Sequence, residues 1–374
     1  MRSVQCELSS ELTSGVRRVV SAEELAGEWT PEINFLVLAN SPEDLALAER
    51  LVAGDLKNVA WAASADLMTG DVVKVDAARS KVVVLHRETD QHHSLFVTNR
   101  CNSLCLMCSQ PPTPNADPWL LKEALDTLRH MRASPRRLGV TGGEPTLLGA
   151  DLVNLLRSAR ALHPATGIEV LTNGRRLADP GLVSQLFGPA VENVSWLVPL
   201  YGHASYLHDF VVQAPGAFDQ TIGGMLTLQE HGQPIQLRIV LIEPVLRQLG
   251  ELAHFIALNL PFVREVALMA SEPIGFALAN REVCDVDLRD WQETLVATIA
   301  ALRRHGVPVI LMNTPLCALP DELRSFAHRS ISDWKNVFAA ECEGCCAKDQ
   351  CAGLFAWHER GWKPTRIQPI QEIV

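Results

Sequence analysis

Apolar runs of strand length alternate with amphipathic segments along most of this chain. In the first 90 residues, the continuous apolar run Ile33–Ala39 predicts a buried strand. A capping serine, Ser41, followed by proline predicts the start of a helix that ends near Gly54. Asp71–Val75 and Lys81–His86 predict a β-hairpin. These elements indicate a small α/β unit that carries no recognisable site.

From His93 onward, strand-like segments alternate with helical patterns. Six strands are predicted here, at Ser94–Thr98, Arg137–Thr141, Gly167–Thr172, Val194–Leu200, Ile235–Ile242 and Glu265–Met269. A last helix, Leu288–His305, precedes a further strand at Val307–Met312. Six β/α alternations predict a parallel sheet covered by helices, either open or curled into a barrel. In such folds the chemistry lies at the carboxyl ends of the strands.

Composition and charge narrow the class of protein. Hydrophobic residues make up 47% of the 374 residues and charged residues 20%, which is typical of a globular chain. The net charge of −10 argues against a nucleic-acid partner. No apolar run reaches the roughly 18 residues that a membrane span needs, and the N-terminus lacks the apolar core of a secretory signal. We therefore expect a cytoplasmic protein without membrane association.

Ten cysteines in a cytoplasmic chain need a chemical reason, because clustered thiols in a reducing compartment are more often metal ligands than disulfides. They form two groups and two single residues. The first group is Cys101, Cys105 and Cys108, and the second is Cys317, Cys342, Cys345, Cys346 and Cys351. Cys6 and Cys284 stand alone and are expected to be unligated.

The first group has the spacing Cys-x3-Cys-x2-Cys directly after the first strand of the predicted barrel. Three thiolates on one short loop can ligate three irons of a [4Fe–4S] cluster and leave the fourth iron open to another ligand. The alternative is a structural zinc ion, but structural zinc takes four protein ligands and no fourth cysteine lies nearby. The pattern therefore favours a cluster with an open iron.

Two glycine-containing motifs follow the next two strands. They are Gly142, Gly143, Glu144 and Pro145 after the second strand, and Thr172, Asn173 and Gly174 at the end of the third. Paired glycines let a backbone approach a ligand closely, and a carboxylate can hold an ammonium group. We therefore expect these strand ends to bind a cofactor.

Together the three motifs resemble those of the radical S-adenosylmethionine (SAM) superfamily, over about Ser94 to Met269. The resemblance implies that the open iron chelates the amino and carboxylate groups of SAM. One electron from the cluster then cleaves SAM to a 5′-deoxyadenosyl radical. The resemblance also assigns contact with the SAM amino group to Gly142–Pro145, and contact near the ribose or carboxylate to Thr172–Gly174. Met107 stands where the family usually has an aromatic residue.

A narrower resemblance rests on short sequence segments further along the chain. Pro199–His203, His208–Phe210, Ala214–Phe218 and Ser330–Asn336 are similar to segments of the radical SAM maturases of His-Xaa-Ser peptide systems. This resemblance implies a ribosomally made substrate peptide with His-Xaa-Ser repeats, and a second radical SAM maturase as partner. An electron donor such as flavodoxin or ferredoxin is expected as well.

Polar residues after the fourth strand leave two interpretations open. His208 and Asp209 either orient a substrate and move a proton, or cap a loop by hydrogen bonds. Tyr201 and Tyr206 are the two tyrosines of the chain and are candidates for a radical relay or for substrate stacking.

The second cysteine group supplies a four-thiolate set, Cys317, Cys342, Cys345 and Cys351. This set resembles the shortened C-terminal twitch modules of radical SAM maturases, which hold one auxiliary iron–sulfur cluster. Four thiolates also suit zinc, and free thiols are a third alternative. Cys346 could replace Cys345 as a ligand.

The expected fold class is α/β. We predict a partial (β/α)6 radical SAM barrel at residues 91–306, an N-terminal α/β extension at 1–90 and a cysteine-rich, twitch-like module at 307–374. The expected function is SAM cleavage followed by modification of a peptide. The alternatives are a radical SAM enzyme acting on a small metabolite or RNA, and a non-catalytic iron–sulfur electron-transfer or scaffold protein. The Gly-Gly-Glu turn argues against the last, because an electron carrier needs no ligand-binding strand end.

Overall fold

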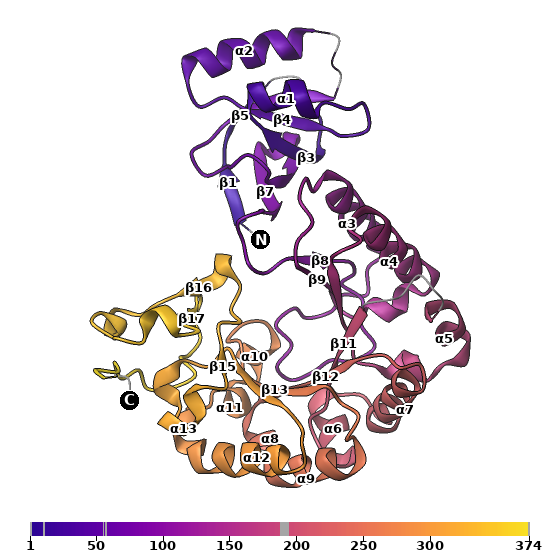
Figure 1. Ribbon diagram of the computed structural model, residues 1–374, viewed down its shortest axis with the longest axis vertical. Helices are drawn as coiled ribbons and strands as arrows, with labels where there is room; N and C mark the ends of the chain where they lie inside the picture. Colours follow the sequence, from indigo (N-terminus) through magenta and orange to yellow (C-terminus); the bar gives the residue numbers. More distant parts are fainter. Residues whose placement is uncertain (1, 10–11, 55, 57, 188–193, 373–374) are drawn as a thin grey trace. The chain divides into compact units, whose positions relative to one another are not determined.

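The computed structural model describes residues 2–9, 12–54, 56, 58–187 and 194–372, and the chain divides into two compact units (Figure 1). The first unit comprises residues 1–97, 118–139 and 154–167. The second comprises residues 98–117, 140–153 and 168–374. Because the cysteine loop and the ends of the next strands all fall in the second unit, the candidate site lies within one compact body.

A seven-stranded sheet forms most of the first unit. Its strands are β1 (Arg2–Gln5), β2 (Glu7–Leu8), β3 (Gly15–Val20), β4 (Phe35–Leu38), β5 (Val59–Ala63), β6 (Val72–Asp76) and β7 (Lys81–His86), in the order β1-β7-β6-β3-β4-β5-β2. Only Cys6 separates the two edge strands, so one short segment pairs with β7 through β1 and with β5 through β2. The sheet therefore closes on itself around a core that includes Val19, Leu36 and Val73.

The predicted N-terminal elements are confirmed. The apolar run Ile33–Ala39 contains β4, and α2 (Pro42–Ala53) begins after Ser41, whose side chain accepts a hydrogen bond from the amide of Asp44. The hairpin consists of β6 and β7, which pair antiparallel. A second helix, α1 (Ala22–Glu28), packs with α2 against β4 and β5.

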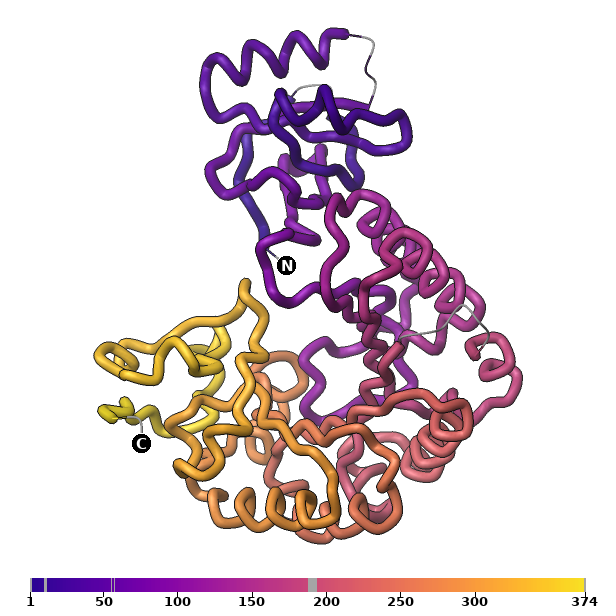
Figure 2. Tube along the Cα trace, in the orientation of Figure 1, coloured from indigo at the N-terminus to yellow at the C-terminus, as the bar shows by residue number. Residues whose placement is uncertain are grey.

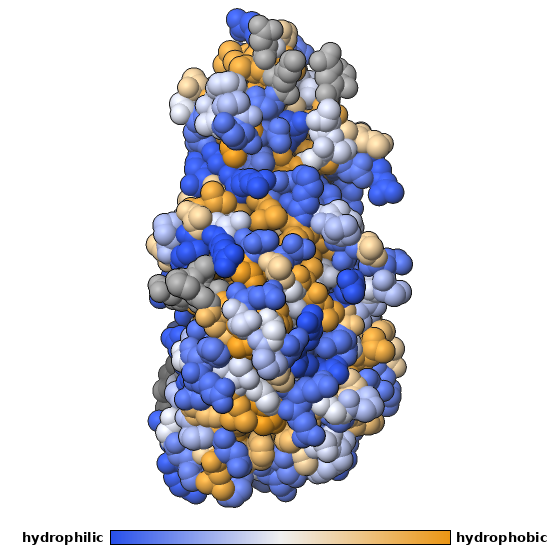
Figure 3. Space-filling view, turned by 90° about the vertical axis from the view of Figure 1, so that its right-hand side faces the viewer, coloured by the Kyte–Doolittle hydropathy of each residue, from blue (hydrophilic) through white to orange (hydrophobic). Residues whose placement is uncertain are grey.

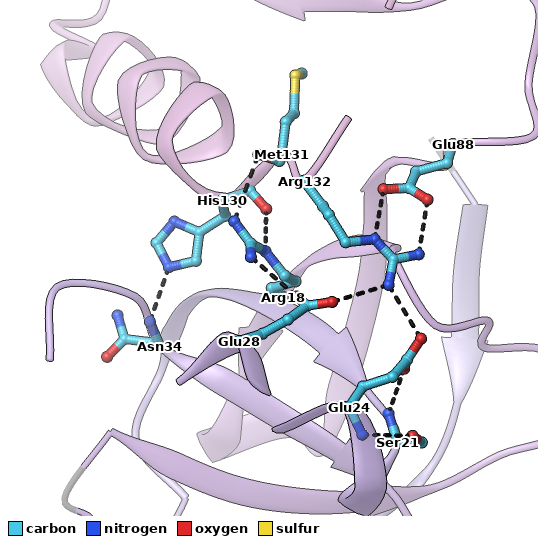
Figure 4. Close-up of polar contacts among 9 residues, drawn as sticks. All are labelled: Arg18, Ser21, Glu24, Glu28, Asn34, Glu88, His130, Met131 and Arg132. Atoms are coloured by element: carbon cyan, nitrogen blue, oxygen red, sulfur yellow. Dashed lines mark hydrogen bonds and ion pairs between the residues drawn. The ribbon is translucent and has the colours of Figure 1, made fainter. Parts of the chain in front are cut away.

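An ion-pair network on Arg132 joins α1 to the end of α3 (Pro118–His130) (Figure 4). The guanidinium of Arg132 lies 3.0 Å from Glu24, 3.1 Å from Glu28 and 2.9 Å from Glu88. The backbone carbonyl of His130 accepts a hydrogen bond of 2.8 Å from Arg18. One arginine thus forms ion pairs with three carboxylates of this unit.

The larger sheet follows the order of the sequence. Its strands are β8 (Ser94–Phe96), β9 (Arg137–Thr141), β10 (Gly167–Leu171), β11 (Val194–Pro199), β12 (Ile235–Leu241), β13 (Glu265–Ala270), β14 (Val309–Met312) and β15 (Ala327–His328). Each neighbouring pair from β10 to β15 is parallel. The six predicted strands are confirmed at β8–β13, and the further strand predicted at Val307–Met312 is β14, which pairs with β13.

Helices alternate with the strands of this sheet. The remaining helices are α4 (Ala150–Leu162), α5 (Pro180–Leu186), α6 (Ser205–Val212), α7 (Ala217–Glu230), α8 (Glu243–Leu246), α9 (Leu249–Asn259), α10 (Phe276–Ala279), α11 (Arg281–Cys284), α12 (Gln292–Arg304) and α13 (Asp321–Arg324). Alternate residues of β12 are fully buried, as expected for a strand with one face under helices. The helix predicted at Leu288–His305 starts later than expected, because Leu288–Trp291 forms a tighter 3-10 turn before α12.

The C-terminal segment has little regular structure and follows an irregular path after β15 (Figure 2). Its two short strands, β16 (Asn336–Val337) and β17 (Leu354–Phe355), pair antiparallel. No helix of the described residues is long and apolar enough to cross a bilayer. On the face shown in Figure 3, hydrophobic residues lie between more numerous hydrophilic ones.

Candidate radical SAM site

The cysteine loop, residues 98–117, is closed at its base by Asp117. The carboxylate of Asp117 accepts hydrogen bonds from the hydroxyl of Thr98, at 3.2 Å to each oxygen, and from the backbone amide of Asn99. The amide of Thr113 donates to the carbonyl of Asn99 at 3.0 Å. These bonds hold both ends of the loop at the carboxyl end of β8.

Backbone hydrogen bonds fix the middle of the loop beside α6 and α10. The amides of Leu104 and Leu106 donate to carbonyls at the end of α6, at 3.0 and 2.9 Å. The amide of Phe276, the first residue of α10, donates to the carbonyl of Cys108 at 2.8 Å. All three contacts involve only backbone atoms, so the positions of the cysteines follow from the path of the loop.

Gly142 and Gly143 bring the end of β9 against the start of the cysteine loop. The amide of Gly143 donates to the carbonyl of Thr98 at 2.7 Å, and the amide of Glu144 donates to that of Arg100 at 2.8 Å. A Cβ atom at Gly142 would collide with the carbonyl oxygen of Thr98, and one at Gly143 would collide with that of Arg100. The glycines are therefore required by the approach of one backbone to another, in addition to any approach to a ligand.

The carboxylate of Glu144 joins the second strand end to the third. It is fully buried and accepts hydrogen bonds from the amide and hydroxyl of Thr146, at 2.9 and 2.5 Å. It also accepts from the hydroxyl of Thr172 and the amide of Asn173, both at 2.6 Å. Burial raises the pKa of Glu144, while these hydrogen bonds lower it. The predicted contact with an ammonium group stays a prediction, because the donors seen here all belong to the protein.

The third strand end reaches the cysteine loop through Asn173. Its side-chain amide donates to the side-chain oxygen of Asn102 at 2.6 Å and lies 4.0 Å from the sulfur of Cys101. The guanidinium of Arg175 donates to the carbonyl of Asn102 and to the hydroxyl of Ser103. Gly174 adopts a φ of 76°, which permits the sharp turn between these contacts.

The structure therefore brings the residues of the first cysteine group and both glycine motifs into one site. Pro145 is buried beside Glu144 at the start of a short 3-10 helix. Burial, together with the neighbouring thiol of Cys108, raises the pKa of Cys101 to about 11 and that of Cys105 to about 12. Thiolates at these positions thus need a cation, and the sulfur-only donor set fits iron.

Across the described residues, no three His, Cys, Asp or Glu side chains converge as ligands of a single metal ion. That geometry is required of a zinc site, in which every ligand lies within about 2.3 Å of one centre. A four-iron cluster is different, because each thiolate binds its own iron. The donor chemistry of the cysteine loop is compatible with such a cluster.

Four cysteines of the second group line one cavity. They are Cys317, Cys342, Cys345 and Cys351, and apolar residues such as Leu316, Leu354 and Ile370 complete the lining. Backbone amides point at two of the sulfurs. The sulfur of Cys351 accepts from Leu316 and Gly353, and that of Cys345 from Ile370, all at 3.4 Å. Such N–H···S contacts are typical of sulfurs that ligate iron–sulfur clusters.

Cys346 does not belong to this cavity. Its side chain is exposed, while its amide donates to the carbonyl of Ile370 at 3.0 Å. The amide of Cys345 donates to the carbonyl of Cys342, which forms a turn. Both Cys342 and Cys345 line the cavity. Of the two adjacent cysteines, Cys345 is the one that the structure places with the other three.

The polar residues after β11 form hydrogen bonds with the protein backbone. His208 is buried and its Nδ1 accepts a hydrogen bond from the amide of Tyr201 at 3.2 Å. Asp209 accepts from the amides of Gly216 and Phe218, at 2.6 and 2.7 Å. These contacts support the loop-capping interpretation of both residues.

The two tyrosines differ in their surroundings. Tyr201 is buried, and its pKa is raised by burial and by the nearby thiols of Cys105 and Cys108. Tyr206 is 59% exposed on α6 and donates to the side chain of Gln248. Of the two, Tyr201 is the one beside the candidate site.

Two residues that shape the site were not predicted from the sequence. Asp117 closes the loop, and its position directly before Pro118 at a helix start is a signal that could have identified it. Gly275 has a φ of 66°, and a Cβ there would contact the carbonyl oxygens of Cys108 and Ser109. No local pattern marks Gly275, because the segment that it meets lies far away in the sequence.

Comparison with known proteins agrees with this geometry. The sequence profile of the radical SAM superfamily matches residues 95–256, which contain the cysteine loop and both glycine motifs. The match supports a radical SAM region over these residues.

Individual relatives cover less of the chain. GTP 3′,8-cyclase of Paenarthrobacter nicotinovorans is 36% identical over 101 residues, which are 25% of this chain and 27% of the cyclase. The chain thus spans about a quarter of this curated relative. A radical SAM methyltransferase from Sphaerobacter thermophilus has 16% identity and a TM-score of 0.42 over 67% of this chain and 71% of its own. The structure of anSMEcpe with bound AdoMet and Cp18Cys peptide has 15% identity and a TM-score of 0.45, over 58% and 62%.

Proposed function

We propose that this protein is a radical SAM maturase that modifies a ribosomally made peptide with His-Xaa-Ser repeats. The observation that carries the radical SAM part is the junction of three strand ends, where the carboxylate of Glu144 joins Thr172 and Asn173 beside the cysteine loop. The proposed peptide substrate is supported by the sequence segments Pro199–His203 and Ser330–Asn336, which are similar to segments of His-Xaa-Ser system maturases.

In this proposal Cys101, Cys105 and Cys108 would hold a [4Fe–4S] cluster, and SAM would bind the fourth iron, which has no protein ligand. When bound, the cluster and SAM supply a 5′-deoxyadenosyl radical that abstracts a hydrogen atom from the substrate. Gly142–Pro145 and Thr172–Gly174 contact SAM. Asp117 and Glu144 hold the loop and the strand ends in place, and burial of Glu144 keeps water from this junction.

The second cysteine group holds an auxiliary iron–sulfur cluster in the same proposal. Its support is the cavity that Cys317, Cys342, Cys345 and Cys351 share, together with the amides that point at Cys345 and Cys351. A zinc ion on the same four thiolates is the competing occupant. The further partners proposed are a second radical SAM maturase and a one-electron donor protein.

The test begins with anaerobically purified protein, reconstituted with iron and sulfide and reduced by dithionite. We expect 5′-deoxyadenosine from SAM, and a change in the EPR spectrum of the reduced cluster when SAM is added. The variant in which Cys101, Cys105 and Cys108 are all replaced by Ala should form no 5′-deoxyadenosine. Turnover that survives in this variant would refute the radical SAM assignment.

A second assay separates the substrates. A His-Xaa-Ser repeat peptide is incubated with the active enzyme and its partner maturase, and mass spectrometry follows any change in peptide mass. GTP serves as the comparison substrate, because a GTP 3′,8-cyclase is among the similar proteins. SAM cleavage with an unchanged peptide and a converted nucleotide would overturn the peptide assignment while leaving the radical SAM site in place.

A further inference from the structure

We propose that the segment Ser330–Asn336 positions the two backbone amides that donate to the sulfur of Cys351, and so makes the cluster of the second cysteine group easier to reduce. We call Ser330–Asn336 the brace segment. The proposal rests on the proposed function, because it concerns the auxiliary iron–sulfur cluster that is proposed there.

The sulfur of Cys351 accepts hydrogen bonds from two amides that belong to different parts of the chain. They are the amides of Leu316 and Gly353, and each nitrogen lies 3.4 Å from the sulfur. Gly353 follows Cys351 closely in the sequence, whereas Leu316 lies 35 residues before it. The two contacts therefore need two separate supports, and the two ends of the brace segment supply them.

Ser330 supports the turn that leads to Leu316. Asn313 directly follows β14 and has a φ of 58°, in the left-handed region that residues other than glycine seldom adopt. The hydroxyl of Ser330 accepts a hydrogen bond from the amide of Asn313 at 2.7 Å and donates one to its side-chain oxygen at 3.0 Å. These two bonds stabilise the conformation that turns the chain from β14 toward Leu316 and Cys317.

Asn336 supports the peptide group that carries the second amide. Its side-chain amide donates to the carbonyl of Ala352. Because a peptide group is planar, this carbonyl and the amide of Gly353 have one common orientation. A Cβ atom at Gly353 would lie 2.9 Å from the side-chain nitrogen of Asn336, so the two residues are in close contact. By holding the carbonyl, Asn336 orients the amide that points at the sulfur of Cys351.

Lys335 anchors the brace segment to the loop after β13. Its ammonium nitrogen lies 3.1 Å from the carboxylate of Glu272, and 5.3 and 5.8 Å from the ring centres of Phe355 and Trp357. A cation that contacts aromatic faces and a carboxylate together is held in one place. The segment between Ser330 and Asn336 is therefore fixed at its middle as well as at both ends.

Hydrogen bonds to the sulfurs are one determinant of the reduction potential of an iron–sulfur cluster. On reduction, one electron passes from the reductant to the cluster, and no bond forms or breaks. The added electron increases the negative charge on the cluster and its sulfurs. An N–H that points at a sulfur therefore stabilises the reduced state more than the oxidised state. Removal of a support should lower the reduction potential.

The test is a redox titration of the reconstituted protein, followed by EPR. The signal of the second cysteine group is the one that SAM does not change. Ser330→Ala and Asn336→Ala each remove one support, and Ser330→Thr keeps the hydroxyl. Ser332→Ala is the matched control within the same segment, because the side chain of Ser332 makes no capping hydrogen bond.

We expect the equilibrium constant for one-electron reduction of the second cluster to fall about tenfold in each alanine variant, which is about 59 mV. Ser330→Thr and Ser332→Ala should match the wild type. Iron should stay at about eight per chain, and the SAM-responsive signal should keep its midpoint. An unchanged midpoint, an equal shift of both signals or loss of the iron of the second group would each overturn the proposal.

A wild-type protein without a SAM-insensitive signal would instead refute the proposed auxiliary cluster. The second cysteine group is then loaded with zinc, and the transfer of zinc to EDTA is timed. A thiolate that loses an N–H donor is more easily displaced from its metal, so transfer should be about tenfold faster in Ser330→Ala and Asn336→Ala, but not in Ser332→Ala. Equal transfer rates in all four proteins would overturn the role of the brace segment as well.

Discussion

The carboxylate of Glu144 accepts a hydrogen bond from the hydroxyl of Thr172 at 2.6 Å, within a site that is closed to solvent. Because the two residues end neighbouring strands, this bond ties the Gly-Gly-Glu turn to the segment that reaches Cys101 through Asn173. The glutamate thus acts through the geometry of the protein, whatever contact its turn makes with a cofactor. A buried carboxylate with four protein donors is a positioning residue.

Replacing Glu144 by Gln should damage the whole junction. The amide nitrogen of Gln cannot accept the hydrogen bonds that a carboxylate oxygen accepts, so at least one buried donor is left without a partner, at a cost of about 1–3 kcal/mol. We expect a lower melting temperature, less bound iron after reconstitution and weaker SAM binding, all in the same variant. The control is Glu251→Gln on the exposed face of α9. Iron content and stability that match wild type would contradict this role.

Asp117 offers a test of the cysteine loop itself. Asp117→Ala removes the acceptor that holds Thr98 and Asn99, while it leaves all three cysteines in place. We expect the free energy of unfolding to fall by about 1–3 kcal/mol. The amount of iron bound to the first cysteine group should fall by a larger fraction than the amount of folded protein. Asp151→Ala, an exposed aspartate in the first turn of α4, is the control. Full iron content in the Asp117 variant would show that the backbone contacts alone position the loop.

The sequence was sufficient to predict the elements that create the site. Strand positions followed from apolar runs, and the three motifs lie at strand ends because each one directly follows such a run. The partners of the glycines were not predictable in this way. A pair of adjacent glycines shows that something comes close, but only the fold shows that the carbonyl groups of Thr98 and Arg100 do so.

Two other features depend on contacts between distant segments. The closure of the N-terminal sheet needs β1 and β2 to pair with two different strands, and each is too short to leave a periodic signal. The choice between Cys345 and Cys346 depends on one turn, in which adjacent side chains point to different sides. Spacing alone could not separate these two cysteines.

Metal analysis tests what the four cysteines of the second group bind. With an auxiliary four-iron cluster, total iron should approach about eight per chain, and Cys342→Ala with Cys351→Ala should remove about half of it. The SAM-responsive EPR signal should remain, because the first cysteine group is untouched. Cys346→Ala is the matched control and should keep the wild-type metal content, since its side chain is exposed. About four irons and one zinc in the wild type would contradict an auxiliary iron–sulfur cluster.

The buried histidine beside Tyr201 predicts how stability depends on pH. Burial lowers the pKa of His208 from 6.5 to about 4, so near pH 5 the unfolded chain binds a proton at this residue that the folded protein does not. The stability that His208 contributes is therefore fully present above about pH 6.5 and is lost as the pH falls toward 4. A shift of this size corresponds to about 3 kcal/mol at most.

His208→Asn tests this dependence, because the side-chain oxygen of Asn can accept the hydrogen bond from the amide of Tyr201 without gaining a proton. Melting temperatures are measured anaerobically between pH 7.5 and pH 5 for the wild type, this variant and His254→Asn, which changes an exposed histidine. The curve of His208→Asn should be flatter than the other two, although a slope should remain because burial also lowers the pKa of His86 to about 4. Parallel curves for all three proteins would show that His208 is protonated in the folded state as readily as in the unfolded chain.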